Sequence, residues 1–335
     1  MLQPSPSSAR RFGCAVLLGA TVAGCSMNST ATTPSNLQAG TSPAATLQRD
    51  KLFARGFGQS SSRHAYASGW IAPDAKKKKN KPLIYWGSYD SNTIDFFSAK
   101  GANPPEKGQI TAGLSNPERL VVDKSLNVYA TNLGNDTITG YKRGATAPFL
   151  TISDGVNTPT GLTVDAAGTV YCANVGNDTI TEYPKGKTKP SLTIEAFAEY
   201  LATDTKKNLY AAEASAVYEF APGSANGTNL NLSIGSPGAL AVDKHGNIIV
   251  IDESTNAIDV FPAGKTQPSK TIQVPAGDAF GLSLNKSEKS VYVTVLGNSD
   301  DFVVQQLPYP KGTSLTTKIS GAYGEWPIAA SPDAP

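Results

Sequence analysis

The feature that most constrains this chain is an internal repeat of about forty residues. Three series of residues recur in the same phase, and such agreement is not expected by chance. The first series is an acid or amide: Asp123, Asp165, Asp204, Asp243 and Asn285. The second is mostly tyrosine: Tyr129, Tyr171, Tyr210, Ile249 and Tyr292. The third places an aromatic residue three positions before a glycine: Tyr141, Tyr183, Phe220, Phe261 and Tyr309.

Each repeat contains four short apolar runs, many with β-branched or aromatic residues, separated by Gly-Asn, Asn-Asp or Pro-Gly turns. This pattern predicts a four-stranded antiparallel sheet. Such a sheet has two apolar faces and must stack on its neighbours, and radial stacking gives a β-propeller. The chain contains 31 glycines and 23 prolines, and only 17% of its residues are charged. This composition suits the same all-β fold and disfavours a helical one.

The two ends of the repeat region predict how the ring closes. Residues 326–333 have the proline-to-aspartate spacing of an innermost strand, yet the chain ends there. Residues 82–85 begin the repeat one strand late. The C-terminal strand is therefore expected to complete the N-terminal blade, and five further blades beginning near 117, 159, 197, 237 and 279 make six in all.

The repeat resembles that of the NHL-type six-bladed propellers over essentially all of residues 81–335. The matching motifs are Pro-x-Gly-Leu-x-Val-Asp, as in residues 159–165, and Gly-Asn-Asp-Thr-Ile, as in residues 134–138. It looks especially like an exported bacterial branch with Tyr-Pro-x-Gly and a final Thr-Ile strand. The resemblance implies a fold more than a function, because the same ring serves binding modules, sensors, lyases and lactone hydrolases.

The N-terminus has the order of an export signal. Arg10 and Arg11 precede an apolar run, and Val22-Ala23-Gly24-Cys25 resembles the bacterial lipobox. The resemblance implies cleavage before Cys25 and a diacylglycerol on its thiol, with the outer membrane, facing periplasm or exterior, as destination. An ordinary secretory signal is the alternative. We therefore expect a signal peptide at 1–24, a lipid-anchored flexible linker at 25–80 and the propeller at 81–335.

Charge is distributed unevenly along the chain. Residues 81–335 hold nineteen basic and twenty-five acidic side chains, so a net negative body disfavours nucleic acid as a partner. The linker is basic and ends in the run Lys76 to Lys79, which is either simply solvated or holds anionic lipid or cell-wall polymer. The aromatic patch Phe53, Phe57, Tyr66 and Trp70 is the part of the linker that could pack on the body.

Several catalytic chemistries are disfavoured by composition. The propeller contains one histidine, His245, in a predicted turn, which argues against a histidine-based metal site or a Ser-His-Asp triad. Propeller lyases similar to NHL domains use several histidines. Cys172 aligns with Ala130, Ala211 and Val250, so it is expected to be a small core residue rather than a nucleophile.

Two sets of residues are candidates for a site. The loops before the innermost strands are the least repetitive part of each unit and should open at the channel mouth; there lie Arg119, Glu199, Tyr200, Asp278, Tyr323, Glu325 and Trp326. A second set occupies one repeat position at the end of the second strand: Asn132, Asn174, Glu213 and Asp252. These oxygen-bearing side chains either form an arc that holds a calcium-type ion or each cap their own turn.

The sequence thus favours a binding protein without cofactor over an enzyme, since it contains no complete catalytic set. The leading hypothesis is a membrane-anchored, monomeric propeller that contacts an envelope protein, peptide or glycan through the channel-mouth rim. The alternative is a calcium-dependent lactone or ester hydrolase resembling gluconolactonase-like propellers. A third hypothesis is a structural or adhesive envelope protein.

Overall fold

The computed structural model divides the chain into two compact units, Met1–Asn36 and Leu37–Pro335. The structure describes residues 69–72, 82–274, 277–285, 287–296, 302–322 and 328–330, all in the second unit. Cys25, the lysine run 76–79 and the rim candidates Tyr323, Glu325 and Trp326 lie outside the described residues. Within the described ranges, no helix has the length and apolar character needed to cross a membrane.

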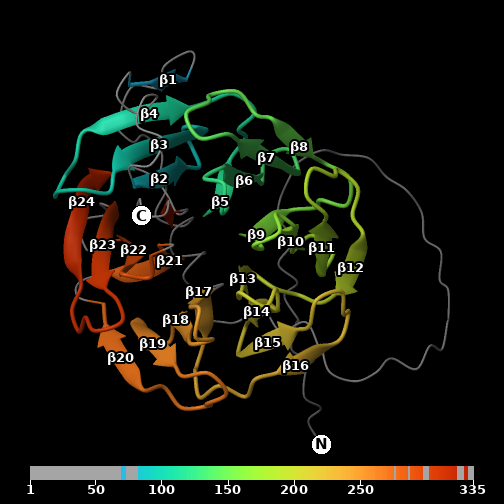
Figure 1. Cartoon of the computed structure of the whole chain (residues 1–335), viewed down its shortest axis with the longest axis vertical. Coiled ribbons are helices and arrows are strands. Elements are labelled where there is room, and N and C mark those ends of the chain that lie inside the picture. Colours follow the sequence, from blue (N-terminus) through green and yellow to red (C-terminus); the bar gives the residue numbers. More distant parts are fainter. Residues whose placement is uncertain are drawn as a thin grey trace, which may run out of the picture. The chain divides into compact units, whose positions relative to one another are not determined.

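The second unit forms a six-bladed β-propeller, as predicted (Figure 1). Six innermost strands surround the channel: β5 (Pro117–Val122), β9 (Pro159–Val164), β13 (Tyr200–Thr203), β17 (Pro237–Val242), β21 (Asp278–Leu284) and β25 (Ile328–Ala330). The second strands are β2 (Leu83–Ser88), β6 (Val128–Asn132), β10 (Val170–Asn174), β14 (Leu209–Glu213), β18 (Ile248–Asp252) and β22 (Ser290–Leu296).

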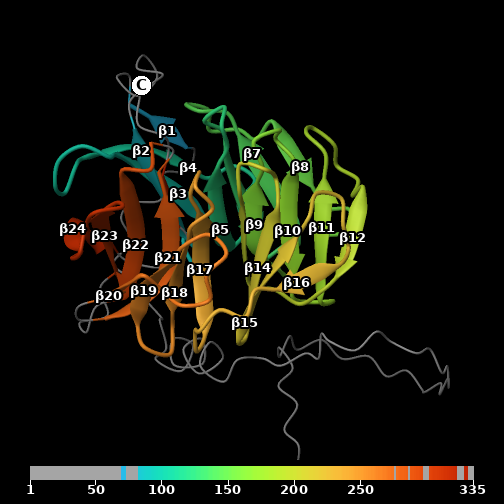
Figure 2. The ribbon, with the colours of Figure 1, turned by 60° about the horizontal axis from the view of Figure 1, so that its bottom comes forward.

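The third strands are β3 (Thr93–Ser98), β7 (Thr137–Tyr141), β11 (Thr179–Tyr183), β15 (Ala216–Phe220), β19 (Ala257–Phe261) and β23 (Phe302–Pro308). The outer strands are β4 (Glu106–Ile110), β8 (Leu150–Ile152), β12 (Leu192–Glu195), β16 (Gly227–Asn229), β20 (Lys270–Gln273) and β24 (Thr316–Ala322). Strands within each blade pair antiparallel, and Figure 2 shows the blades standing side by side around the ring.

The ring closes as the sequence predicts. Strand β25 pairs antiparallel with β2, with Ile84 opposite Ala330 and Trp86 opposite Ile328. The first blade therefore combines the last strand of the chain with strands from the beginning. Closure gives the first blade the same four-strand order as the others, so that each blade presents the short edge of one innermost strand to the channel.

The first blade also contains a strand that the predicted domain boundary missed. β1 (Trp70–Ile71) pairs with β4, with Trp70 opposite Gln109 and Ile71 opposite Gly108. A Cβ at Gly108 would lie 2.6 Å from the backbone oxygen of Trp70, so glycine lets this added strand approach closely. The propeller therefore starts before residue 81, inside the segment predicted as linker.

The repeated aspartates hold the turn between the first two strands of their blades. Asp165 Oδ1 accepts hydrogen bonds from the backbone nitrogens of Ala167 and Thr169, both 2.8 Å long. Asp123, Asp204, Asp243 and Asn285 make the same kind of turn. The carboxylate thus satisfies backbone donors that the turn leaves unpaired.

The core consists of apolar layers between adjacent blades. The aromatic residue of the third repeat series is fully buried in most blades, including Tyr141, Tyr183 and Phe261. The hydroxyls of Tyr141 and Tyr183 donate to the backbone oxygens of Ala112 and Asp154, at 2.7 Å and 2.8 Å. These bonds tie the third strand to the loop that enters the blade, so the repeated tyrosine fixes both packing and connection.

Candidate functional site at one mouth of the channel

A belt of leucines crosses the channel. Each of five innermost strands contributes one at the same repeat position: Leu120, Leu162, Leu201, Leu240 and Leu282. The belt lines a cavity on each side of it. Because all innermost strands run in the same direction, the belt separates the mouth where these strands begin from the mouth where they end.

The residue before each leucine lies one position nearer the mouth where the strands begin. Three blades have small residues there, Gly161, Ala239 and Gly281, and the other two have Arg119 and Tyr200. Arg119, Tyr200, Ala239 and Gly281 line a cavity of about 50 Å³ together with the leucines. The two large side chains therefore occupy this layer of the channel, and the space left there suits one small chemical group.

Arg119, Tyr200 and Glu253 form a connected polar cluster, which we call the mouth cluster. The guanidinium carbon of Arg119 lies 4.4 Å from the ring centre of Tyr200. The Tyr200 hydroxyl donates a 2.9 Å hydrogen bond to Glu253 Oε1. Arg119 comes from the second blade, Tyr200 from the fourth and Glu253 from the turn after β18 in the fifth. Only the closed ring brings them together.

The mouth cluster retains hydrogen-bonding capacity. The Nε and Nη1 atoms of Arg119 are buried and have no hydrogen-bond partner among the described residues, and the same is true of Glu253 Oε2 and Thr160 Oγ1. A buried polar atom without a partner costs about 1–3 kcal/mol. A ligand group that accepts from Arg119 and donates to Glu253 would recover that free energy.

The protonation of Glu253 is set by the cluster. The pKa of Glu253 is raised to about 7. Burial is the main cause and the charge of Glu199 adds to it, whereas the Tyr200 hydrogen bond and the charge of Arg119 lower the pKa in part. Burial, followed by the charge of Glu253, also raises the pKa of Tyr200 well above its ordinary value. Near neutral pH, Tyr200 is therefore a hydrogen-bond donor and Glu253 exchanges between charged and neutral forms.

The structure places the predicted rim residues in different surroundings. Arg119 and Tyr200 are in contact, and half-buried Glu199 is close enough for its charge to raise the pKa of Glu253. Asp278 is exposed at the start of β21. Tyr323, Glu325 and Trp326 are outside the described residues.

Sequence reasoning missed Glu253. Its repeat position is occupied by Leu133, Val175 and Ala214 in other blades, so a charge there departs from the pattern. Arg119 and Tyr200 depart from the repeat in the same way, near the start of the innermost strands. A departure from the repeat in the turns after the second strands is therefore the sequence signal that marks Glu253.

Asn132, Asn174, Glu213 and Asp252, the residues of the predicted arc, make their hydrogen bonds separately, each in its own blade. Asn132 Oδ1 accepts from the backbone nitrogen of Ser115 at 3.1 Å, and its Nδ2 donates to Thr137 and Thr139. Asn174 repeats this arrangement in the next blade, accepting from Asn157 and donating to Thr179 and Thr181. These are the contacts that the capping interpretation expects.

The two acids of the arc are likewise engaged locally. Asp252 accepts from the backbone nitrogens of Ser236 and Ser254 and from the Ser254 hydroxyl. Burial alone would raise the pKa of Asp252, but these hydrogen bonds outweigh it and lower the pKa. Burial raises the pKa of Glu213, while a hydrogen bond with Tyr218 of the same blade lowers it in part. Among the described residues, no three His, Cys, Asp or Glu side chains gather as a metal site.

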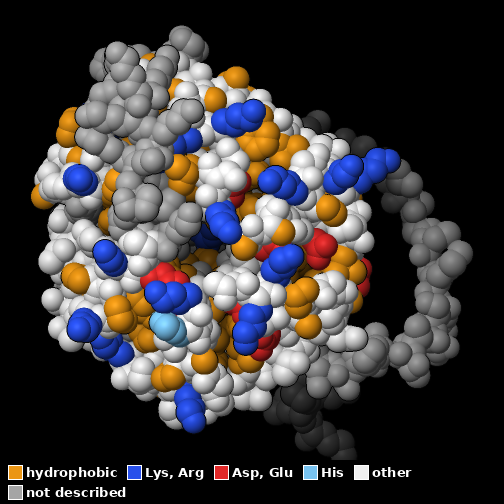
Figure 3. All heavy atoms as spheres, in the orientation of Figure 1, with side chains coloured by type: hydrophobic (Ala, Val, Ile, Leu, Met, Phe, Trp, Pro, Cys, Tyr) orange, Lys and Arg blue, Asp and Glu red, His pale blue; other side chains and the backbone are white. Residues whose placement is uncertain are grey.

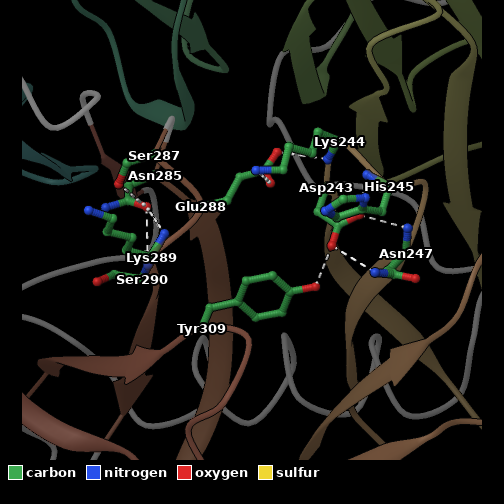
Figure 4. A network of polar contacts seen from close by, with 10 residues as sticks. All are labelled: Asp243, Lys244, His245, Asn247, Asn285, Ser287, Glu288, Lys289, Ser290 and Tyr309. Carbon is green, nitrogen blue, oxygen red and sulfur yellow. Dashed lines mark hydrogen bonds and ion pairs between the residues drawn. The ribbon is translucent and has the colours of Figure 1, made fainter. Parts of the chain in front are cut away.

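The larger cavity lies at the opposite mouth, which the sequence analysis did not single out. It measures about 420 Å³ and extends from the leucine belt to the turns that contain Asp123, Asp165 and Asn285. Figure 4 shows the turn of Asn285 beside the turn of Asp243 in the neighbouring blade; an ion pair of 3.6 Å between Lys244 and Glu288 links the two turns. The side chains of Asp123, Asp165 and Asn285 that line the cavity already accept hydrogen bonds from the backbones of their own turns.

Cys172 is completely buried, as the repeat alignment expected. Burial raises the pKa of its thiol far above the ordinary value, so the reactive thiolate is suppressed. Its structural surroundings are those of a core residue.

Comparisons with known proteins give the fold but no family. No family model matches the chain, and no curated protein matches it. A crystal structure of a nidogen/laminin complex contains a chain with TM-score 0.61 and 14% identity, covering 74% of this chain and 98% of that one. An uncharacterised protein from Bacteroides caccae gives TM-score 0.56 and 14% identity, covering 75% and 98%.

A third similar structure is virginiamycin B lyase from Staphylococcus aureus, solved with quinupristin, with TM-score 0.52 and 9% identity, covering 78% of this chain and 92% of that one. That structure is of a variant described as catalytically inactive, in which a histidine is replaced by alanine. At these identities the likeness establishes the six-bladed β-propeller fold alone.

Proposed function

We propose that this chain is a membrane-anchored binding or scaffold propeller that binds an envelope protein, peptide or glycan at the mouth cluster. The observation that carries the proposal is the set of buried, unpartnered donors on Arg119 beside the unpartnered Oε2 of Glu253. Both groups are held in place, Arg119 by the face of Tyr200 and Glu253 by the Tyr200 hydroxyl. A preorganised polar pair of this kind costs little ordering on binding.

The ligand group that best fits the mouth cluster is a carboxylate next to a hydrogen-bond donor. A carboxylate accepts from the fixed fork of a guanidinium, and an adjacent amide, ammonium or hydroxyl donates to Glu253. Peptide termini and acidic sugars offer both. The cavity of about 50 Å³ admits this group alone, so the rest of the ligand would contact the rim outside it.

The absence of histidine from the mouth cluster separates this proposal from a lyase. Within the described part of the chain the one histidine is His245, whose backbone nitrogen bonds Asp243 in a turn beyond the leucine belt. The mouth cluster contains a cation, a phenol and a carboxyl group, but no nucleophile paired with a base. These groups support recognition better than catalysis.

The location of the propeller is part of the proposal. The lipobox-like segment ending at Cys25 supports export and a lipid anchor, with the outer membrane as the proposed site and a monomer as the proposed state. The segment between Cys25 and β1 would then be the tether.

Calorimetric titration of the full chain carrying Cys25→Ser, which prevents acylation there, tests the binding proposal. The ligands are short peptides with a free or an amidated C-terminus, and uronic acid oligosaccharides with free or esterified carboxylates. We expect each acid to bind about tenfold or more tightly than its neutral partner, since hydrogen bonds to charged groups contribute about 1.5–3 kcal/mol. Arg119→Gln should abolish this preference.

Lys124→Gln is the matched control, because Lys124 is an exposed cation on the other side of the leucine belt. It should leave the preference for acids unchanged. Equal binding of acids and neutral partners, or equal effects of the two substitutions, would contradict the proposal. Pull-down from the envelope of the native host, with wild type and the Arg119 variant compared, then identifies the partner.

A further inference from the structure

The exposed charges of the propeller are segregated by turn. Among the described residues, the exposed lysines all lie in turns that follow the first or third strand of a blade. They are Lys100, Lys124, Lys142, Lys185, Lys187, Lys189, Lys206, Lys207, Lys244, Lys265, Lys289 and Lys311. We call the surface that they form the lysine face. Every blade contributes at least one of them.

The exposed acids have the opposite distribution. Within the described ranges they all lie in or beside the segments that follow the second or fourth strand of a blade. They are Asp90, Asp136, Asp154, Asp178, Glu195 and Asp278. These segments are at the mouth where the innermost strands begin, together with the mouth cluster. The two ends of the channel therefore carry exposed charge of opposite sign.

The carboxylates on the lysine face are withdrawn from its surface. Asp123, Asp165 and Asp243 are buried and accept hydrogen bonds from their own turns. Asp204 is partly buried and accepts the same bonds. Glu288 is partly buried and pairs with Lys244. Figure 3 views this face, on which the histidine also lies, and shows Lys and Arg side chains spread around the channel with fewer Asp and Glu side chains among them.

The distribution of the lysines indicates the shape of the partner. They surround the channel instead of following one groove, so a planar array of anions can meet all six blades at once. A nucleic acid duplex is a rod and would meet only some of them. Phe149 is the only large apolar side chain that is exposed among the described residues, so insertion into hydrocarbon contributes little.

We infer that the lysine face docks on a bilayer containing anionic phospholipids, and that the mouth cluster then faces away from the membrane. The attraction comes from basic side chains near the negative surface of the bilayer and decays within a Debye length. Docking of this kind is independent of acylation at Cys25. It would orient a tethered propeller so that its ligand mouth remains open to partners.

Vesicle co-sedimentation of the full chain carrying Cys25→Ser tests the inference. Vesicles of phosphatidylcholine alone are compared with vesicles containing phosphatidylglycerol at about 30 mol%, in about 0.05 M and about 0.5 M salt. We expect binding to the anionic vesicles at low salt, at least about tenfold weaker binding at high salt, and none to neutral vesicles.

Two variants with equal changes in net charge separate the lysine face from the linker. In the face variant, Lys124, Lys206 and Lys207 are changed to glutamate; in the linker variant, Lys76, Lys77 and Lys78 are changed likewise. The face variant should lose about 100-fold or more in vesicle affinity, because each basic residue near the surface contributes several-fold. The linker variant should lose less than tenfold. Thermal melting verifies that both remain folded.

Three outcomes would overturn the inference. One is a face variant that binds as the wild type does while the linker variant does not. The second is tighter binding to a DNA duplex than to vesicles at equal phosphate concentration. The third is competition by soluble glycerol phosphate, which would point to capture of one headgroup in the cavity of about 420 Å³. Arg119→Gln should bind vesicles normally, so failure here and failure of the proposed ligand site are distinguishable.

Discussion

The guanidinium of Arg119 lies over the ring of Tyr200, although their two blades are separated by a third. The intervening blade has Gly161 at the same level, where a Cβ would lie 2.8 Å from the Cβ of Ala173 and 3.1 Å from the backbone oxygen of Glu199. Glycine thus keeps this layer clear of a side chain. No side chain of the intervening blade therefore stands at this position between Arg119 and Tyr200.

Substitution of Tyr200 by phenylalanine and by leucine separates its two roles. Tyr200→Phe keeps the ring beneath Arg119 but leaves Glu253 Oε1 without its donor, so we expect about 1–2 kcal/mol lower stability and a smaller loss of ligand affinity than Tyr200→Leu causes. Tyr200→Leu removes the ring as well and should weaken ligand binding about fivefold or more. Urea unfolding and calorimetry measure the two effects; equal ligand affinities of the two variants would argue against a positioning role for the ring.

Glu253 makes stability fall with rising pH. Its pKa is raised to about 7 in the folded chain by burial, so between its ordinary pKa and about 7 the folded state binds more protons than the unfolded state. The free energy of unfolding should therefore decrease across this window, by on the order of 2–3 kcal/mol, and level off above it.

Glu253→Gln should abolish that pH dependence and be more stable than wild type at about pH 8, where the buried charge is absent. Asp278→Asn, at an exposed acid of the same mouth, is the control and should retain the slope. Urea unfolding from about pH 4.5 to 8.5 measures it. A Glu253→Gln variant with the wild-type slope would show that another group titrates.

Tyr309 stabilises the interface between the fifth and sixth blades. Its hydroxyl donates a 2.7 Å hydrogen bond to Asp243 Oδ2 (Figure 4). Burial alone would raise the pKa of Asp243, but this bond and those from Asn247 and the turn backbone lower it. Tyr309→Phe should therefore cost about 1.5–3 kcal/mol near neutral pH.

The contribution of Asp243 is present above its unfolded pKa and is lost as pH falls through its folded one, so the cost of Tyr309→Phe should shrink in acid. Lys244→Met removes an ion pair between the same two blades, with a lysine that is 60% exposed. Such a surface pair contributes about 0–1 kcal/mol, so this control should change the free energy of unfolding much less. Equal losses would contradict the assignment.

Calcium should not stabilise the propeller. The side chains of Asn132, Asn174 and Asp252 are engaged with backbone and hydroxyl groups of their own blades, and binding one ion would break those bonds. Thermal melting of the full chain with calcium and with chelator should give the same midpoint. A midpoint that falls on chelation would favour the hydrolase hypothesis and justify a screen of lactones and esters.

The sequence by itself determined the blade and the number of blades. The spacing of Asp123, Tyr129 and Tyr141 and of their counterparts follows from local requirements: a turn that needs a carboxylate, and strands that need a buried aromatic residue. Ring closure could also be predicted from the sequence, because the two terminal segments are complementary parts of one repeat. These features depend on residues near each other in the chain, or on the repeat itself.

The tertiary structure decided what the ring brings together. Arg119, Tyr200 and Glu253 belong to three blades, and their contacts depend on the radius of the channel and on rotamers that no repeat encodes. The lysine face has the same origin: net charge along the chain is acidic over residues 81–335, and only the up-and-down course of each blade sorts lysines and acids to opposite ends. Short-range patterns specify a blade, whereas closing six blades around an axis creates the surfaces on which function depends.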